Sequence, residues 1–352
     1  MKNPTFCIGL MSGTSLDGLD ICYVRFNDET SFEILQAETI HYTSVWRIKL
    51  TEAYQYSAMD LCELDVEFGY FLGDQVKEFM GKHQIQKVDF VSSHGQTIFH
   101  QPQKSFTLQI GNGAAIASRC QQKVVCDFRT QDVILDGQGA PLVPIGDELL
   151  FRQYDACLNL GGFSNISMNR DGKRIAFDIC PINIVLNHYA NQLGFDYDKN
   201  GELSQQGNIN QGLVEELNEL NYYKEPYPKS LGFEWVEQTF LTIVDKYEIS
   251  VEDKLRSCVE HFVVQIESIL SFYDINNVLI TGGGARNVFF INRLRELSAV
   301  EIIIPSDNLI DFKEALIFAF LGYRRINNEI NCLSSVTGAT KDHSSGIIYE
   351  IL

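Results

Sequence analysis

The first chemically informative stretch of the chain is a turn of small and acidic residues near the N-terminus. Residues 8 to 20 read Ile-Gly-Leu-Met-Ser-Gly-Thr-Ser-Leu-Asp-Gly-Leu-Asp, between two apolar segments that favour strands. Gly13 and Gly18 can take positive φ and allow a close approach to a ligand. Clustered N–H groups and hydroxyls suit phosphate oxygens. Asp17 and Asp20 would repel phosphate unless a cation lay between them, so they indicate Mg²⁺. An ordinary hairpin turn is the alternative interpretation of this stretch alone.

Two further glycine-rich turns follow apolar strands later in the chain. Gly161 and Gly162 separate two predicted strands, whereas Gly282 to Gly284 join a strand to a helix. The N-terminus of that helix offers free N–H groups and the positive end of its dipole. Each turn alone is common, but three in this order, each after a strand, predict a nucleotide site. The sequence contains no GK[ST], and no GxGxxG follows the first strand, so neither the P-loop nor the dinucleotide pattern applies.

Composition narrows the class of protein. A chain of 352 residues is long enough for two domains. Its net charge of −18 argues against nucleic acid as a partner, because that binding needs a basic face. The nine cysteines form no CxxC pair and predict a reducing cytoplasm. The apolar run near the N-terminus is too short for a signal peptide, and no stretch approaches the ~20 apolar residues of a membrane span.

The elements that must position these turns follow a strand-first order that occurs twice. The first half reads as strands 5–11, 19–26 and 31–42, helix 60–82, strand 88–93, helix 112–119 and strand 124–128. The second half reads as strands 156–160, 165–169 and 174–179, helices 182–193, 211–220, 234–247 and 251–273, strand 277–280, helix 287–297, strand 301–305 and helix 312–325.

This order predicts an α/β protein with two ribonuclease-H-like domains that face each other across a cleft. We place the domains at residues 1–130 and 131–352, with the extreme C-terminus allowed to pack back on the first. The loop 129–144 is rich in Gly, Pro and Asp and is the predicted hinge.

The order of the three turns is that of the ASKHA superfamily, which comprises actin, heat-shock chaperones and sugar kinases. Within it the chain closely resembles the anhydro-N-acetylmuramic acid kinases. The resemblance spans nearly the whole chain and rests on six strings: Met-Ser-Gly-Thr-Ser-Leu-Asp-Gly at 11–18, Ser-His-Gly-Gln-Thr at 93–97, Asp-Phe-Arg at 127–129, Gly-Gln-Gly-Ala-Pro-Leu-Val-Pro at 137–144, Asn-Leu-Gly-Gly at 159–162 and Val-Thr-Gly-Ala at 336–339.

The resemblance implies a cytoplasmic, homodimeric kinase of peptidoglycan recycling that uses ATP and Mg²⁺. Its reaction opens the 1,6-anhydro bond of 1,6-anhydro-N-acetylmuramic acid with water and phosphorylates the freed 6-oxygen, giving N-acetylmuramate 6-phosphate. It implies small-molecule partners, with no nucleic acid and no membrane.

The resemblance also assigns roles to residues of this sequence. Asp178 takes the role of general base, which suits a carboxylate because the attacking water must lose a proton. The ATP phosphates and Mg²⁺ fall to Gly13, Thr14, Ser15, Leu16, Asp17, Gly18, Leu19, Asp20, Gly161, Gly162 and Glu314, with Asp17 and Asp20 as candidate metal ligands. The adenosine side falls to Gly282, Gly283, Gly284 and Asn287. The sugar side falls to His94, Arg129, Asp132 and Asn183.

The sequence departs from the family pattern next to the base. The family reads Phe-Asp-Thr-Gly-Pro-Gly-Asn, whereas this chain has Ile179, Cys180 and Ile182 at three of these positions. Asp136 replaces a usual glycine, and the segment near Asn331 lacks the usual Pro-Gly. Ile179 and Ile182 motivate one alternative, a kinase of the same fold for another amino or anhydro sugar. A nucleotide-gated binding protein is an alternative from a different class.

Several candidate residues also have a purely structural interpretation. Asp178 can be the cap of the helix that follows it, and His94 can be a polar turn residue. Cys180 has no histidine at a telling spacing, so we expect neutral packing. His261 lies among apolar residues and is expected in a core or an interface. The aromatic loop 222–229 can line the sugar site or make a dimer contact.

Overall fold

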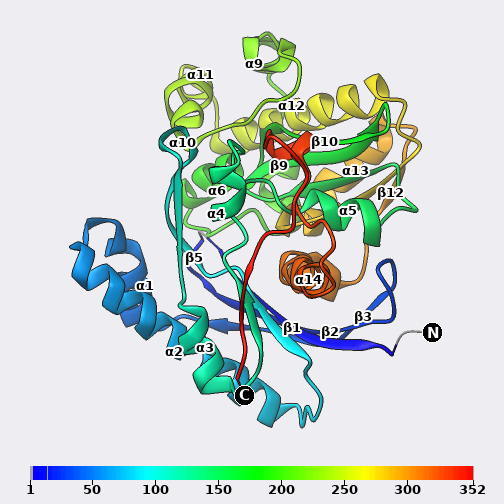
Figure 1. The fold of residues 1–352 in the computed structure, drawn as a ribbon. Coiled ribbons are helices and arrows are strands. Elements are labelled where there is room, and N and C mark those ends of the chain that lie inside the picture. The colour runs from blue at the N-terminus through cyan, green and yellow to red at the C-terminus, as the bar shows by residue number, and fades with distance from the viewer. Residues whose placement is uncertain (1–2, 14, 352) are drawn as a thin grey trace. The chain divides into compact units, whose positions relative to one another are not determined.

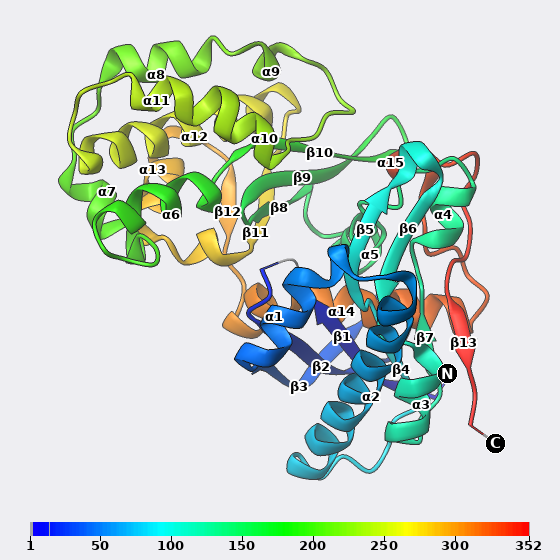
Figure 2. The same cartoon turned by 90° about the vertical axis from the view of Figure 1, so that its left-hand side faces the viewer.

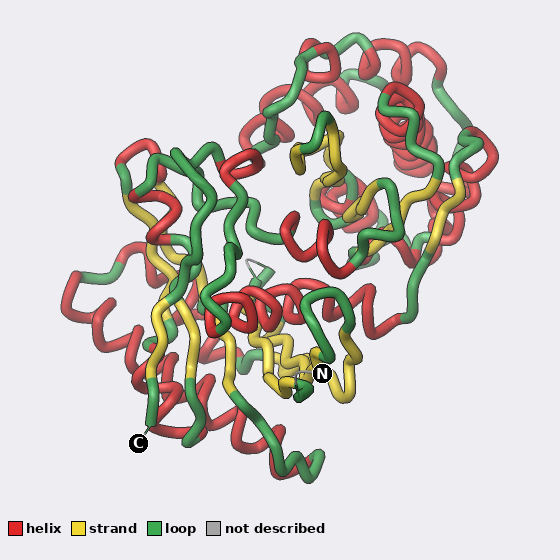
Figure 3. The backbone as a smooth tube through the Cα atoms, turned by 45° about the vertical axis from the view of Figure 1, so that its right-hand side comes forward, coloured by secondary structure: helices red, strands yellow, loops and turns green. Residues whose placement is uncertain are grey.

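The computed structural model describes residues 3–13 and 15–351 in two compact units. Unit 1 comprises Met1–Phe151 and Phe312–Leu352, and unit 2 comprises Arg152–Asp311. Each unit has a central sheet with its own hydrophobic core, and Figure 3 shows strands flanked by helices in both. In the part of the chain that is described, no helix has the length and apolar character needed to cross a membrane.

The sheet of unit 1 has six strands in the order β13-β7-β4-β1-β2-β3. The first three strands of the chain pair antiparallel, β4 and β7 then add in parallel to β1, and β13 closes the far edge antiparallel to β7. Their bounds are β1 Thr5–Ser12, β2 Gly18–Phe26, β3 Phe32–His41, β4 Phe90–Ser93, β7 Val124–Cys126 and β13 Ile347–Tyr349. A hairpin lies outside this sheet, formed by β5 Gln96–Gln101 and β6 Phe106–Ile110.

Helices cover both faces of this sheet (Figure 1). Strand β1 alternates, so that Ile8 and Leu10 enter a core with helix α2, Ala58–Lys82. Gly9 faces helix α14, Asp307–Ile326, whose backbone lies directly against it at Ala315. The other helices of unit 1 are α1 Ser44–Glu52, α3 Gly113–Cys120, α4 Thr130–Ile134, α5 Pro144–Leu150 and α15 Ser334–Thr337, with short 3₁₀ turns at Ala53–Gln55 and Pro102–Lys104.

Unit 2 repeats the same strand order, β10-β9-β8-β11-β12. Three antiparallel strands come first, and two parallel strands extend the sheet from β8, as the views in Figures 1 and 2 show. The strands are β8 Ala156–Leu160, β9 Phe163–Arg170, β10 Lys173–Pro181, β11 Asn277–Thr281 and β12 Glu301–Ile303. The principal helices are α6 Asn183–Gln192, α7 Glu202–Gln206, α8 Gln211–Asn218, α12 Val251–Phe272 and α13 Val288–Leu297.

The remaining part of unit 2 consists of short helices. Residues predicted as one helix, 234–247, form three consecutive segments, of which the middle one is a π-helix. These segments are α10 Phe233–Trp235, the π-helix Val236–Leu241 and α11 Thr242–Asp245. Further short elements are α9 Asn221–Lys224 and the 3₁₀ turns Lys199–Gly201 and Gly283–Arg286.

The predicted fold class is confirmed, because both units have the ribonuclease-H-like order of three antiparallel strands followed by parallel ones. The division of the chain differs from the predicted boundary between residues 130 and 131. Helix α5 belongs to unit 1, where Asp147 forms a buried ion pair of 2.7 Å with Lys313 of α14. The C-terminal strand β13 pairs with β7 in the same unit (Figure 3). The predicted hinge loop 129–144 therefore lies inside unit 1.

We predict that Gly9→Ala destabilises unit 1. A Cβ at this position would overlap the carbonyl oxygen of Ala315, so α14 would have to move away from β1. Such overpacking costs about 1–3 kcal/mol, which urea denaturation measures. Gly81→Ala in α2 is the matched control, because a Cβ there meets no atom within 4 Å. The control should be neutral or stabilising by up to about 1 kcal/mol, and equal stabilities for the two variants would contradict the packing described here.

Candidate functional site

The turn between β1 and β2 lies at one end of the sheet of unit 1. Its strands remain paired up to Ser12 and Leu19. The residue in the left-handed region is Leu16, with φ 55°, whereas neither Gly13 nor Gly18 has positive φ, contrary to expectation. The side chain of Leu16 packs against the core of the unit. A Cβ on Gly18 would lie 2.7 Å from the main-chain oxygen of Ile40, so this glycine is required for close packing between strands.

The acidic residues of the turn are held by neighbouring hydroxyls. Asp17 is exposed, and its Oδ1 accepts a hydrogen bond of 2.6 Å from the Ser15 hydroxyl. Asp20 lies on β2, where its Oδ1 accepts one of 2.6 Å from Thr39. These carboxylates can hold a hard cation such as Mg²⁺, because it takes oxygen ligands. Gly13 has open space, since a Cβ added there would have only the Ser15 hydroxyl within 4 Å. Thr14, also assigned to this turn, lies outside the described residues.

A buried polar cluster that the sequence did not single out lies at the end of β1. The Ser12 hydroxyl forms a hydrogen bond of 2.6 Å with the Tyr42 hydroxyl and donates another to Gln96 Oε1. Burial raises the pKa of Tyr42, so the phenol stays protonated at neutral pH. The cluster fixes the last residue of β1 before the turn. Its sequence signal is the string at 93–97, which contains Gln96.

His94 and Arg129, both predicted on the sugar side, are in direct contact in unit 1. Arg129 donates from Nε to His94 Nε2 at 2.9 Å and from Nη1 to the carbonyl of Gly139 at 2.6 Å. His94 Nδ1 lies 2.8 Å from the carbonyl of Gly95, so Nδ1 carries the proton and Nε2 accepts. Burial, and then the charge of Arg129, lower the pKa of His94 to about 3. His94 is therefore neutral at physiological pH.

Glu314, predicted near the nucleotide, is an exposed residue of α14. Burial lowers the pKa of Arg129, and the negative charge of Glu314 is the largest effect that opposes this shift. The negative charge of Glu314 therefore favours the charged form of Arg129.

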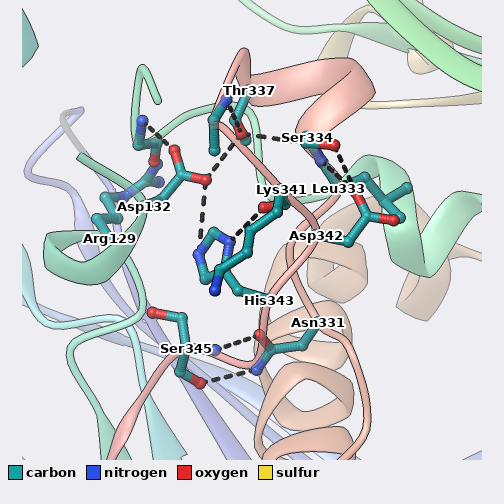
Figure 4. A network of polar contacts seen from close by, with 12 residues as sticks. Arg129, Asp132, Asn331, Leu333, Ser334, Thr337, Lys341, Asp342, His343 and Ser345 are labelled. Carbon is teal, nitrogen blue, oxygen red and sulfur yellow. Dashed lines mark hydrogen bonds and ion pairs between the residues drawn. The ribbon is translucent and has the colours of Figure 1, made fainter. Parts of the chain in front are cut away.

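Asp132 is fully buried and holds loops together (Figure 4). Its Oδ2 accepts a hydrogen bond of 2.7 Å from the N–H of Gly139, and its Oδ1 accepts one of 2.7 Å from the Thr337 hydroxyl. With 0% exposure the side chain has no surface for direct contact with a sugar. In this structure it positions Gly139, which in turn binds Arg129.

The second and third glycine turns lie next to each other in unit 2. The Gly161 carbonyl accepts a hydrogen bond of 3.2 Å from the N–H of Asn183, the first residue of α6, and the Gly162 carbonyl accepts one of 2.8 Å from the N–H of Ile182, the residue before the helix. A Cβ on Gly282, which has φ 82°, would approach within 2.9 Å of the Leu160 carbonyl. The Asn183 amide donates to the same carbonyl at 3.1 Å. Parallel pairing of β8 with β11 brings these turns together.

Asn287, predicted on the adenosine side, has a structural role in the described geometry. Its Oδ1 accepts a hydrogen bond of 3.0 Å from the N–H of Phe290 and so caps helix α13. The side chain is 8% exposed. It fixes the direction in which the helix leaves the third glycine turn.

Asp178 lies at a β-bulge in β10. The pairing register with β9 shifts between Asp178 and Cys180, which leaves Ile179 as the extra residue. The loop 222–231 forms hydrogen bonds with three atoms of Asp178. Its Oδ2 accepts a hydrogen bond of 2.8 Å from the N–H of Leu231, its N–H donates to the Lys229 carbonyl at 3.2 Å, and its carbonyl accepts from the Tyr222 hydroxyl at 2.6 Å.

The electrostatics of Asp178 suit a proton acceptor. The side chain is half-buried, and burial raises the pKa of its carboxyl group, while the Leu231 N–H partly opposes the shift. Its Oδ1 accepts no hydrogen bond from the residues that the structure describes. The helix-cap interpretation is wrong, because α6 begins at Asn183 without a side-chain cap from any described residue. The aromatic loop 222–229 is in contact with Asp178. The sequence alone leaves open whether this loop lines the sugar site or makes a dimer contact.

The residues that depart from the family pattern face the core. Ile179, Cys180 and Ile182 are 1%, 0% and 1% exposed and belong to the hydrophobic core of unit 2. Burial raises the pKa of the Cys180 thiol, so the expected neutral packing is confirmed. His261 is also buried as expected, between Asn218 and Tyr223.

Comparison with known proteins identifies the family. The sequence profile of the family described as anhydro-N-acetylmuramic acid kinase matches residues 5–351. The anhydro-N-acetylmuramic acid kinase of Francisella tularensis subsp. novicida is 33% identical over 371 aligned residues, covering 96% of this chain and 97% of that protein. That of Haemophilus influenzae is 34% identical and covers 98% of each. A solved structure, component A of (R)-2-hydroxyglutaryl-CoA dehydratase from Acidaminococcus fermentans, matches with a TM-score of 0.49 at 13% identity, over 92% of this chain and 99% of that one.

We predict that His94 makes the stability of unit 1 depend on pH. Its pKa in the fold, about 3, lies below the ~6.5 of an unfolded histidine. The unfolded chain therefore binds a proton first as pH falls, and stability is lost below about pH 6.5. Between about pH 7.5 and about pH 5.5 the loss is about 1.4 kcal/mol for this group. Glutamine does not titrate, so His94→Gln should remove this contribution. The difference in unfolding free energy between about pH 7.5 and about pH 5.5 should then be smaller by about 1.4 kcal/mol.

Fluorescence can follow the units separately in this experiment. The chain has two tryptophans, Trp46 in unit 1 and Trp235 in unit 2, so a Trp235→Phe background reports on unit 1. His188→Gln, an exposed position of unit 2, is the control and should leave the dependence unchanged. A His94→Gln variant with the full pH dependence would contradict the assignment of a neutral, buried His94.

Proposed function

The chain belongs to the anhydro-N-acetylmuramic acid kinase family, and on that premise we propose that it opens 1,6-anhydro-N-acetylmuramic acid with water and phosphorylates the freed 6-oxygen. The product is N-acetylmuramate 6-phosphate, and the phosphoryl donor is ATP. The observation that carries the proposal is Asp178, which lies on a β-bulge with its backbone held by two hydrogen bonds and its carboxyl group by one, and whose carboxyl pKa is above its ordinary value.

In the proposed mechanism Asp178 accepts the proton of the attacking water. A raised pKa brings a carboxylate nearer to the proton affinity that general-base catalysis requires at neutral pH. Water adds to the anomeric carbon, and the bond from that carbon to the 6-oxygen breaks. The released 6-oxygen then attacks the γ-phosphorus of ATP, the bond from that phosphorus to the bridging oxygen breaks, and ADP leaves. Arg129, held by neutral His94 and the Gly139 carbonyl, is the cationic group that we assign to the sugar side.

We assign the phosphates of ATP to the β1–β2 turn and to Gly161 and Gly162. The open space at Gly13 and the exposed carboxylate of Asp17 support this assignment. Asp17 and Asp20 fit Mg²⁺, which would balance phosphate charge in a protein with a net charge of −18. Gly282 to Gly284 are assigned to the adenosine side, where they are adjacent to Asn183 and Leu160.

The alternative of a different sugar loses its motivation. It rested on Ile179 and Ile182, and both side chains lie in the hydrophobic core. We further propose a cytoplasmic homodimer that acts in peptidoglycan recycling. All nine cysteines are unpaired, which supports a reducing compartment. Family resemblance alone supports the dimer and the pathway.

We predict that Asp178→Asn lowers kcat by about 10²–10⁴-fold, because the amide cannot take the proton. Binding of ATP, measured by calorimetry, should remain close to that of the wild type. Asp171→Asn, at an exposed position in the same β9–β10 hairpin, is the matched control and should have wild-type activity. In heavy-oxygen water the wild-type product should carry the label at the anomeric position. A fully active Asp178→Asn variant, or a product without label, would overturn the mechanism.

We predict that Gly13→Val weakens ATP binding at least about tenfold, or about 1.4 kcal/mol. The valine side chain would occupy the open space that we assign to phosphate, whereas its Cβ meets only the Ser15 hydroxyl at 3.6 Å. The thermal midpoint should therefore stay close to the wild-type value. Gly81→Ala is the control with unchanged affinity. Undiminished binding of ATP by Gly13→Val would remove the β1–β2 turn from the nucleotide site.

A further inference from the structure

Three metal-ligating side chains converge in unit 1 outside the groups used above for catalysis. Asp132 follows β7, whereas Cys332 and His343 come from the segment after α14. One oxygen, the sulfur and one imidazole nitrogen of these residues all lie within 4.8 Å of one another. All three side chains are buried, with 0%, 1% and 6% exposure. Figure 4 shows Asp132 and His343 pointing toward each other.

The backbone holds two of these ligands side by side. Cys332 and His343 form an antiparallel β-bridge, with N–H to carbonyl distances of 3.1 Å and 3.2 Å in the two directions. Residues paired in this way place their side chains next to each other. The neighbouring Asn331 is fully buried, and its side chain bonds to the main chain of Ser345 at 2.8 Å and 2.7 Å (Figure 4). The pair is therefore fixed by main-chain geometry.

The third ligand is oriented independently. Each oxygen of Asp132 already accepts one hydrogen bond, from Thr337 at Oδ1 and from Gly139 at Oδ2. A carboxylate oxygen has two lone pairs, so Oδ1 keeps one for a further ligand. That lone pair lies on the side of His343, whose Nε2 is 3.6 Å away.

The hydrogen bonding of His343 leaves a lone pair directed at this carboxylate. His343 Nδ1 lies 3.1 Å from the Lys341 carbonyl, so Nδ1 carries the proton in the neutral ring. Nε2 is buried without a hydrogen-bond partner among the described residues. Two electron-pair donors thus face each other beside a thiol. A histidine that binds a metal commonly donates its other nitrogen to a backbone carbonyl in this manner.

We propose that Asp132, Cys332 and His343 form a structural site for a divalent transition-metal ion of the zinc type. Sulfur and imidazole ligands favour zinc over Mg²⁺ and Ca²⁺, which take oxygen ligands. The three donors supply three positions of a tetrahedron, and a water molecule can fill the fourth. On binding, the Cys332 thiol gives up its proton to solvent and coordinates as thiolate.

Such an ion would fasten the C-terminal segment to the loop that carries Gly139. The same two segments are joined by main-chain hydrogen bonds, from Gln138 to Thr337 at 2.8 Å and from Thr340 to Leu135 at 2.9 Å. Of the three ligands, Asp132 also holds Gly139 and through it Arg129, whereas Cys332 and His343 have no part in the proposed reaction, and occupancy of the site does not depend on that reaction.

Metal content and cobalt spectroscopy test this proposal. The full chain is purified without chelator and dialysed against zinc-containing buffer. Elemental mass spectrometry should then find about one zinc ion per chain. With Co²⁺ in place of zinc, a thiolate-to-cobalt charge-transfer band should appear. Cys332→Ser and His343→Gln should lose the retained zinc, and Cys332→Ser should also lose the band. Cys62→Ser, at an exposed position of α2, is the control and should keep both.

Removal of the ion gives a second readout. A chelator should lower the thermal midpoint of the wild type and of Cys62→Ser, but not that of His343→Gln. The proposal is overturned if wild-type protein retains no zinc and gives no charge-transfer band with Co²⁺. It is equally overturned if Cys332→Ser and His343→Gln retain as much zinc as Cys62→Ser. Because the wild-type spectrum is decisive by itself, the test holds even where a variant fails to fold.

Discussion

The parallel pairing of two strands in each unit is the constraint on which the candidate sites depend. β4 pairs in parallel with β1, and β11 pairs in parallel with β8. Parallel neighbours end at the same edge of a sheet, so the segments that leave them must be adjacent there. In unit 1 this brings the turn after Ser12 close to His94, whose N–H bonds to the Leu10 carbonyl at 3.0 Å. In unit 2 it brings Gly161 next to Gly282. Gly282 and Gly284 are needed at this edge because a Cβ on either would lie 2.9 Å from the carbonyl oxygen of Leu160.

The third strand of unit 2, β10, sets the position of Asp178 through a β-bulge. β10 is antiparallel to β9, and regular alternation would give Asp178 and Cys180 the same orientation. The bulge at Ile179 breaks this relation, so that Cys180 enters the core while Asp178 stays half-buried beside the loop 222–231. Ile179 and Ile182, which replace smaller family residues, belong to the hydrophobic core of unit 2.

Much of this architecture could be predicted from the sequence, for a physical reason. Apolar periodicity fixes the long elements, such as α2 and α12, and glycine turns mark the strand ends. The sequence allows the extreme C-terminus to pack on the first domain, but the boundary could not be predicted from it, because the boundary depends on α14 packing against Gly9 and on β13 pairing with β7. These contacts join segments more than 200 residues apart. The β5–β6 hairpin and helix α1 were not predicted. The contact between Asp178 and Leu231 could not be predicted from the sequence either, because it links a strand to a loop 53 residues later.

The chemistry of unit 1 follows from the partial burial of Arg129. A half-buried guanidinium needs acceptors, and it finds them at His94 Nε2 and the Gly139 carbonyl. His94 can accept only when neutral, and its lowered pKa is the consequence of this contact and of burial. With Nε2 occupied by Arg129 and Nδ1 by Gly95, His94 has no nitrogen left for proton transfer to a substrate. Its role is therefore to position Arg129, and Asp132 extends the same arrangement by holding Gly139. Asp132 is fully buried, whereas Asp178 is half-buried and its Oδ1 accepts no hydrogen bond from the described residues, so Asp178 is the carboxylate that we assign to proton transfer.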